Sequence, residues 1–102
     1  MDLAKFIDSK FEWSKRTFGP GLRTIGVTGH IRKELDEIVA DPTDVEEWVD
    51  VVLLALDGAS RAGHSGAEIV ATMISKQEKC EARKWPEWSP EDTVNEHIKE
   101  GS

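Results

Sequence analysis

The feature that most constrains the fold is an almost continuous apolar segment, residues 45–56, which is interrupted by a few acidic side chains. Its valines, leucines, alanine and tryptophan would cover nearly every side of a helix, and such a helix has to be buried all round. Four or five helices made from 102 residues can hardly enclose it. We therefore expect a second subunit to complete the core. The alternative is that the N-terminal and C-terminal helices of the same chain cover this helix.

The rest of the chain also has the pattern of helices separated by stop signals, without a convincing alternation typical of strands. Glycine and proline residues mark the breaks, and Asp44-x-x-Glu47 and Ser65-x-x-Glu68 have the form of capping boxes. We predict one all-α domain over residues 1–102, a bundle of four to five helices. The expected helices cover about residues 3–16, 24–40, 45–62 and 66–83, with a short one from residue 90.

Composition excludes several classes of function. The net charge is −7, and binding to a nucleic-acid backbone requires a basic surface. No apolar run is long enough to cross a bilayer, and the first ten residues lack the pattern of a signal peptide. A single cysteine, Cys80, is typical of a reducing compartment. We expect a protein of the cytoplasm of a cell or infected host that binds neither nucleic acid nor membrane.

Two pairs of acidic residues have matched positions on neighbouring predicted helices. Glu34 and Glu37 are three residues apart, and so are Glu47 and Asp50, so each pair shares one helix face. If the helices fold back as a hairpin, Glu37 faces Glu47 and Glu34 faces Asp50, because the midpoint of each combination is Pro42. The pattern predicts four carboxylates in two facing tiers, one helical turn apart.

Four carboxylates in so small a space need compensation. Protonation would require strongly raised pKa values, and a salt-bridge network could use Arg32, Lys33 or Arg83 as partners. A divalent cation is the simpler solution, because oxygen-only ligands favour Mg²⁺ or Mn²⁺. We interpret the constellation as a site for Mg²⁺ or Mn²⁺ that can bind phosphate and activate water.

Other candidate residues carry weaker signals. His30 lies four residues before Glu34 and could join the same face, although a histidine at a helix entry is more often structural. The cations Lys76, Lys79 and Arg83 share one helix face, which is either solvated or able to hold outer phosphates. The chain has no P-loop motif. Asp57, with Arg61 four residues on, is interpreted as an ordinary helix salt bridge.

Together with the acidic pattern, three collinear blocks carry a resemblance to a known family: TFGPGLRTIGVTGHIRKELDEI, EEWVDVVLLALDGASRAG and KQEKCEARKWPEW. The chain resembles the all-α, MazG-like nucleoside triphosphate pyrophosphohydrolases. Within them it is most similar to the dATP/dGTP pyrophosphohydrolase branch, common in phages and including the MazZ enzymes. The resemblance covers roughly residues 11 to 98.

The resemblance implies a homo-oligomer, a dimer or a tetramer, that hydrolyses a purine dNTP to dNMP and pyrophosphate with two or more Mg²⁺ or Mn²⁺ ions per site. It implies metal ligands at Glu34, Glu37, Glu47 and Asp50. Of these, Glu37 and Glu34 take part in catalysis, and Glu37 helps to deprotonate the water that attacks the α-phosphate. Lys76, Lys79 and Arg83 would hold phosphates. The candidates for the nucleoside end are Trp13, Arg23, His30 and Cys80.

Two positions depart from the family pattern. Relatives often have a second glutamate where this chain has Lys33, and asparagine where it has Cys80. These departures affect the number of metal ions and the contacts to substrate. The resemblance implies that the hydrolysis adjusts the dNTP pool of a phage. Two other functions stay open at this point: hydrolysis of other or non-standard dNTPs to remove them from the pool, and a non-catalytic metal-binding helical oligomer.

Overall fold

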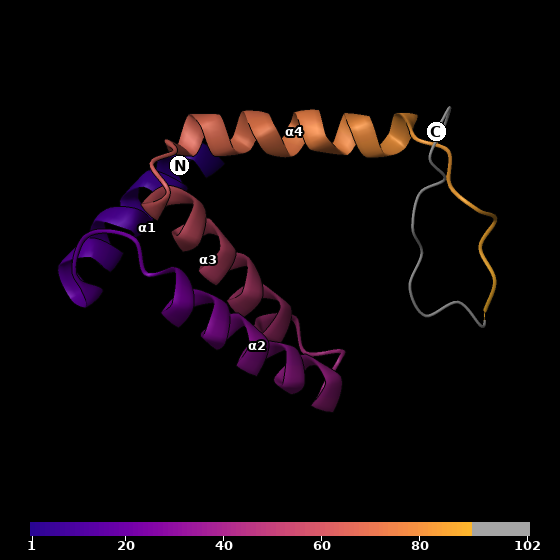
Figure 1. Cartoon of the computed structure of the whole chain (residues 1–102), viewed down its shortest axis with the longest axis horizontal. Helices are drawn as coiled ribbons and strands as arrows, with labels where there is room; N and C mark the ends of the chain where they lie inside the picture. Colours follow the sequence, from indigo (N-terminus) through magenta and orange to yellow (C-terminus); the bar gives the residue numbers. More distant parts are fainter. Residues whose placement is uncertain (91–102) are drawn as a thin grey trace. The chain divides into compact units, whose positions relative to one another are not determined.

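The computed structural model describes residues 1–90 and consists of four helices (Figure 1). They are α1 (Leu3–Phe18), α2 (Thr24–Ala40), α3 (Val45–Arg61) and α4 (Gly66–Ala82). The prediction of an all-α fold is confirmed, with helix boundaries close to those expected. The short helix predicted from residue 90 falls on residues 91–102 and lies outside the described part of the chain.

The chain divides into two compact units, Met1–Val70 and Ala71–Ser102, and the division falls inside α4. The first unit contains α1, α2, α3 and the beginning of α4. In the second unit, the indole Nε1 of Trp85 donates a hydrogen bond to the carbonyl oxygen of Cys80 at 2.6 Å, just beyond the helix end. The single-domain organisation stays a prediction.

Short polar side chains begin the helices. A carboxylate oxygen of Asp2 accepts a hydrogen bond from the amide of Lys5 at 2.8 Å, and the hydroxyl of Ser65 accepts one from the amide of Glu68 at 3.1 Å. These bonds satisfy amides that have no partner within the helix. The capping box expected at Asp44 is wrong in detail. Asp44 accepts from the amide of Glu46 at 2.9 Å, while the carboxylate of the predicted partner, Glu47, lies beside other carboxylates.

Helices α2 and α3 form the predicted antiparallel hairpin (Figure 1). The turn between them is fixed by hydrogen bonds from both ends. The amide of Asp41 donates to the carbonyl oxygens of Glu37 and Ile38 at 3.0 and 3.2 Å, and the indole Nε1 of Trp48 donates to the carbonyl oxygen of Pro42 at 2.9 Å. Because the turn is held this way, the register between the two helices is set within a few residues of Pro42.

A small core joins α1, α3 and the first turn of α4. It consists of Ile7, Leu56 and Ile69, all buried, with Ala59 and Val70 packed against them. Near this core the amide of Gly66 donates to a carboxylate oxygen of Asp8 at 2.7 Å. A Cβ at Gly66 would collide with the backbone of Ala4. The backbones of α1 and α4 therefore approach each other more closely at this point than any side chain would allow.

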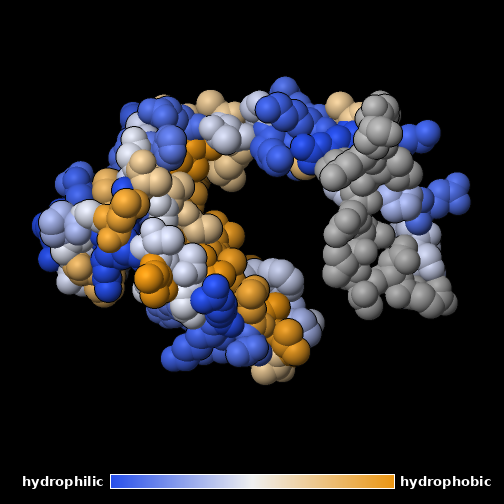
Figure 2. All heavy atoms as spheres, viewed as in Figure 1, coloured by the Kyte–Doolittle hydropathy of each residue, from blue (hydrophilic) through white to orange (hydrophobic). Residues whose placement is uncertain are grey.

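Part of the apolar surface of the hairpin remains exposed. On α3, Val45, Trp48, Val49 and Val52 are all more than 40 % exposed, and on α2 so are Leu35 and Val39. Figure 2 shows apolar residues over the hairpin. The sequence pattern of α3 predicted burial on all sides, yet part of this helix is uncovered in the single chain. A second subunit, as predicted, would have an apolar surface to cover. Among residues 1–90, no helix is both long and apolar enough to cross a membrane.

The close approach at Gly66 predicts that Gly66→Ala destabilises the protein, because the backbone of Ala4 cannot move as a flexible side chain would. We expect a loss of about 1–3 kcal/mol in the free energy of unfolding, the usual cost of overpacking. Gly29, inside α2, is the matched control, since a Cβ there meets no atom. Gly29→Ala should stabilise the protein by up to about 1 kcal/mol. Urea unfolding of both variants measures the difference, and equal stability of the two would contradict the prediction.

Candidate functional site

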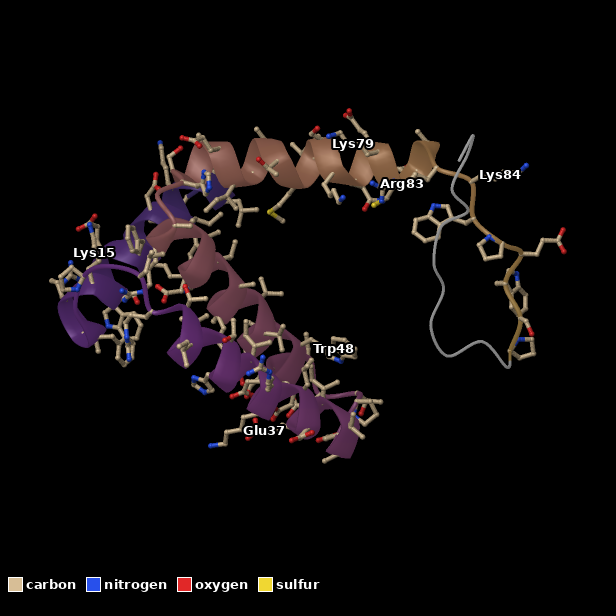
Figure 3. The ribbon with its side chains drawn as sticks, viewed as in Figure 1. Lys15, Glu37, Trp48, Lys79, Arg83 and Lys84 are labelled. Atoms are coloured by element: carbon tan, nitrogen blue, oxygen red, sulfur yellow. The ribbon has the colours of Figure 1, made fainter. Side chains whose placement is uncertain are left out.

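The four predicted carboxylates come together in the structure. Each of Glu34, Glu37, Glu47 and Asp50, called here the acid cluster, has an oxygen atom within 4.8 Å of the others'. Two residues come from α2 and two from α3, so the hairpin register predicted from Pro42 brings the pairs face to face. Figure 3 labels Glu37 on α2. The proximity of these side chains was predictable from sequence; their role as metal ligands stays a prediction.

Burial differs among the four members of the acid cluster. Glu34 is the most buried member, only 7 % exposed, whereas Glu37, Glu47 and Asp50 are half-buried. One carboxylate oxygen of Glu34 and one of Glu47 are inaccessible to solvent and have no hydrogen-bond partner. The apolar neighbours of Asp50 in sequence lie on other faces of α3, and Asp50 itself faces an open cavity.

The proximity of these groups changes their affinity for protons. Burial and the neighbouring Glu37 raise the pKa of Glu47 to about 7. The pKa of Glu34 is also raised, first by hydrogen bonding with Glu37 and then by burial. The pKa of Glu37 is lowered, because Glu34 and Glu47 can both donate to it. In the absence of a cation, the cluster therefore binds protons more readily at Glu34 and Glu47 than at Glu37.

The acid cluster fits a divalent cation by its chemistry. Its donors are all oxygen atoms, which Mg²⁺ and Mn²⁺ prefer, and two of these oxygens are buried without a partner. Neither Arg32 nor Lys33 forms an ion pair with it. Lys33 acts on the cluster only through its charge, which contributes to the lowered pKa of Glu37. A cation would supply positive charge to the cluster and would compete with protons for Glu34 and Glu47.

His30 contacts the cluster from the preceding turn of α2. Its Nε2 lies 3.2 Å from a carboxylate oxygen of Glu34, and more than half of its side chain is exposed. The imidazole can donate to Glu34 and so fix the orientation of that carboxylate, a common role for a group behind a metal ligand. Within the described residues, the group of side chains close enough to share one cation consists of the four carboxylates and does not include His30.

A cavity of about 740 Å³ extends from the acid cluster between α1, α2 and α3. Glu34 and Asp50 line one part of it, and apolar side chains from all three helices line the rest. The size and the mixture of an apolar wall with a few polar groups are typical of sites for small molecules. The lining residues are Phe6, Ser9, Lys10, Trp13, Ser14, Phe18, Arg23, Gly26, Val27, His30, Glu34, Asp50, Leu53, Leu54 and Asp57.

Three of the four residues predicted for the nucleoside end line this cavity: Trp13, Arg23 and His30. The ring of Trp13 meets that of Phe18 edge to face, with centroids 5.6 Å apart, and the guanidinium of Arg23 lies 5.4 Å from the centre of the Phe18 ring. This wall offers flat aromatic surfaces on which a base can stack. The cavity thus combines an acidic part with an aromatic wall.

Sequence reasoning missed two features of the cavity, Lys10 and the buried state of Asp57. Asp57 forms the predicted ion pair with Arg61, with Nε 2.8 Å from Oδ2. The ion pair is not an ordinary surface one, because both residues are less than 10 % exposed and Arg61 also bonds to α1 and to the turn after it. The signal that could have found Asp57 is its position two helical turns beyond Asp50, on the same face.

The remaining predicted site residues belong to the second unit. Lys79 and Arg83 lie at the C-terminal end of α4, as Figure 3 shows, and Lys76 precedes them by one turn. Cys80 is a free thiol, half-buried. Their proposed roles toward phosphate and nucleoside stay predictions.

The raised pKa of Glu47 predicts how stability depends on pH without metal. The pKa of Glu47 rises from 4.5 to about 7 on folding. Protonation of this carboxyl therefore stabilises the folded state, and the stabilisation is fully present at pH values below 4.5, the pKa in the unfolded chain. This contribution is lost as pH rises through about 7. In EDTA, we expect the melting temperature to fall between pH 5 and pH 7.5. Excess Mg²⁺ should restore it at pH 7.5, since a bound cation replaces the protons.

Glu47→Gln is the test variant and Glu46→Gln its control, because Glu46 is an exposed carboxylate on the same helix turn. Glu47→Gln should flatten the pH dependence and weaken the response to Mg²⁺, while Glu46→Gln should leave both as in the unmodified chain. Thermal melts at several pH values measure the effect. A Glu47→Gln protein that keeps the full pH slope would contradict the assigned shift.

Comparisons with known proteins agree with this geometry. The family model of dATP/dGTP pyrophosphohydrolases matches residues 6–102. The Eaa protein of Salmonella phage P22 is 42 % identical over 90 residues, which is 87 % of this chain and 27 % of that protein. The chain thus spans about a quarter of the length of this relative. No solved structure matches the chain. The family match extends over almost the whole sequence, and the chain therefore belongs to the dATP/dGTP pyrophosphohydrolase family.

Proposed function

We propose that the protein is a metal-dependent pyrophosphohydrolase that converts purine dNTPs to dNMP and pyrophosphate. The observation that carries the proposal is the acid cluster at one end of the aromatic-walled cavity. A triphosphate needs cations at its phosphates and a flat apolar surface at its base, and the two regions adjoin in this cavity. The family match supports the same activity.

The proposed reaction is hydrolysis at the α-phosphate. A water oxygen bonds to the α-phosphorus, the bond from that phosphorus to the bridging oxygen breaks, and pyrophosphate leaves. Glu37, which keeps its negative charge among its neighbours, accepts a proton from the attacking water. Glu34, oriented by His30, holds its carboxylate toward the same space. Mg²⁺ or Mn²⁺, two or more per site and held by the acid cluster, would neutralise phosphate charge and lower the pKa of bound water.

Residues outside the acid cluster hold the rest of the substrate in this proposal. The aromatic wall of Trp13 and Phe18, with Arg23, receives the nucleoside. Lys76, Lys79 and Arg83 hold phosphates, and Cys80 contacts the nucleoside. The product suits a role in adjusting the dNTP pool of a phage-infected cytoplasm.

Activity is tested by incubating the protein with each dNTP and either Mg²⁺ or Mn²⁺, and then quantifying dNMP, pyrophosphate and phosphate. We expect equal amounts of dNMP and pyrophosphate from a purine dNTP. Release of single phosphates would refute attack at the α-phosphorus. Absence of turnover with every dNTP would refute the enzymatic proposal and favour a non-catalytic metal-binding oligomer.

Asp50→Asn tests the metal assignment. The substitution keeps the size of the side chain and removes one charge from the acid cluster. We expect kcat/KM to fall at least about 100-fold, since even groups that only support metal ligands are worth 10–100-fold. Binding of Mn²⁺ measured by calorimetry should weaken in parallel. Glu46→Gln is the control and should retain activity, while an active Asp50→Asn enzyme would contradict the assignment.

We also propose that the protein is a homo-oligomer, because the apolar strip of Val45, Trp48, Val49 and Val52 on α3 is exposed. Val49→Glu should separate the subunits, since a two-fold interface brings like charges together. Light scattering after size exclusion measures the mass. Ile25→Glu, at an exposed position outside the strip, should leave it unchanged. A wild-type protein of monomer mass would refute the proposal.

A further inference from the structure

The turn between α1 and α2 forms one edge of the cavity. Phe18, the last residue of α1, and Arg23, the residue before α2, both line the cavity. The turn itself is largely in contact with solvent. Leu22 is 70 % exposed, and about half of the surface of Phe18 is exposed as well. Burial of apolar side chains therefore does little to fix the position of this turn.

A side chain of α3 holds the turn instead. Nη1 of Arg61 donates hydrogen bonds to the carbonyl oxygens of Gly19 and Gly21 at 2.8 and 2.9 Å. In the described part of the chain, no other side chain forms a hydrogen bond with residues 19–22. The amide of Gly19 donates to the carbonyl oxygen of Lys15 at 3.0 Å, which only closes the last turn of α1. The polar contacts between α3 and this turn thus depend on one guanidinium.

Arg61 is itself fixed from two other directions. Its Nε donates to Oδ2 of Asp57 on α3 at 2.8 Å, and its Nη2 donates to the hydroxyl of Ser14 on α1 at 2.9 Å. The side chain is only 1 % exposed. Arg61 is not one of the residues that line the cavity. Its effect on a ligand in the cavity would therefore pass through the residues that it holds.

The conformation of the turn requires glycine at position 19. Gly19 has φ 89° and ψ 164°, a combination that residues with a side chain hardly adopt. A Cβ at this position would meet no atom within 4 Å. A side chain there would thus change the backbone conformation without colliding with a neighbour. The bend brings the guanidinium of Arg23 to 5.4 Å from the centre of the Phe18 ring.

We propose that Arg61 is a positioning residue for the substrate: by holding the turn, it places Phe18 and Arg23 where the nucleoside binds, and it sets the affinity for the nucleotide rather than the rate of hydrolysis. This inference rests on the proposed function. A wall that is already in place loses little entropy when a ligand binds. Asp50 precedes Arg61 by eleven residues, about 16 Å along a helix. Changes at Arg61 therefore leave the acid cluster in place.

The first test is Arg61→Lys, measured with Mg²⁺ and each purine dNTP. Lysine keeps the positive charge beside Asp57, but its single nitrogen cannot also bind both carbonyl oxygens of the turn. We expect KM to rise at least about tenfold while kcat changes less than about threefold, because the lost binding is shared by the ground state and the transition state. Affinity for Mn²⁺, measured by calorimetry without nucleotide, should stay unchanged. An unchanged KM would overturn the inference.

Gly66→Ala is the control that separates positioning from stability. Gly66 lies where α4 meets the backbone of Ala4, and it does not line the cavity. This variant should have a lower melting temperature and an unchanged KM. An equal rise of KM in Gly66→Ala and Arg61→Lys would show that affinity follows stability, and would overturn the inference. A parallel loss of kcat and Mn²⁺ affinity in Arg61→Lys would overturn it too.

Gly19→Ala keeps the test decisive if Arg61→Lys does not fold, because it changes the conformation of the turn and leaves Arg61 and its side-chain partners intact. Its KM should also rise at least about tenfold with kcat nearly unchanged. Melting curves establish folding before the kinetics are measured. An unchanged KM in Gly19→Ala would overturn the inference and leave the proposed function standing. Absence of turnover of every dNTP by the unmodified protein would overturn both.

Discussion

The side chain of Arg61 holds together the elements that form the cavity. Its five N–H groups have five partners: Oδ2 of Asp57, the carbonyl oxygens of Gly19 and Gly21, and both the carbonyl and the hydroxyl oxygen of Ser14. These partners belong to α3, to the turn after α1 and to α1 itself. Because a guanidinium has five donors in one plane, a single side chain fixes the turn and two helices. Lysine, with one nitrogen, could not replace it.

The acid cluster on the α2–α3 hairpin differs from the network around Arg61. The difference distinguishes a group of side chains that stabilises the fold from one that is suited to bind a ligand. Around Arg61, the protein itself supplies the opposite charge, because the guanidinium is paired with the carboxylate of Asp57. In the acid cluster, oxygens of Glu34 and Glu47 stay buried without partners, and the carboxylates change each other's pKa values. Buried charges without compensation are destabilising. The acid cluster, unlike the network around Arg61, is therefore best understood as a site that a cation from solution completes.

Sequence patterns predicted the features that depend on neighbours in the chain. The helix ends follow from Asp2, Pro42 and similar local signals, and the spacing around Pro42 was enough to bring the acid cluster together. Contacts between distant segments were not predictable. Nothing near Arg61 indicates that it reaches Gly19 and Gly21, some 40 residues earlier. Glu47 suited both a capping box and the acid cluster, and only the packed hairpin decides between these roles.

Asp57 connects the two halves of this picture, because one carboxylate both anchors Arg61 and faces the cavity. Its Oδ2 is fixed by the same network that sets the turn after α1, so Oδ1 cannot rotate away from the position it occupies. A wall that is held rigidly before a ligand arrives loses little entropy on binding. The interaction that stabilises the fold is thus also what fixes the shape of this end of the cavity.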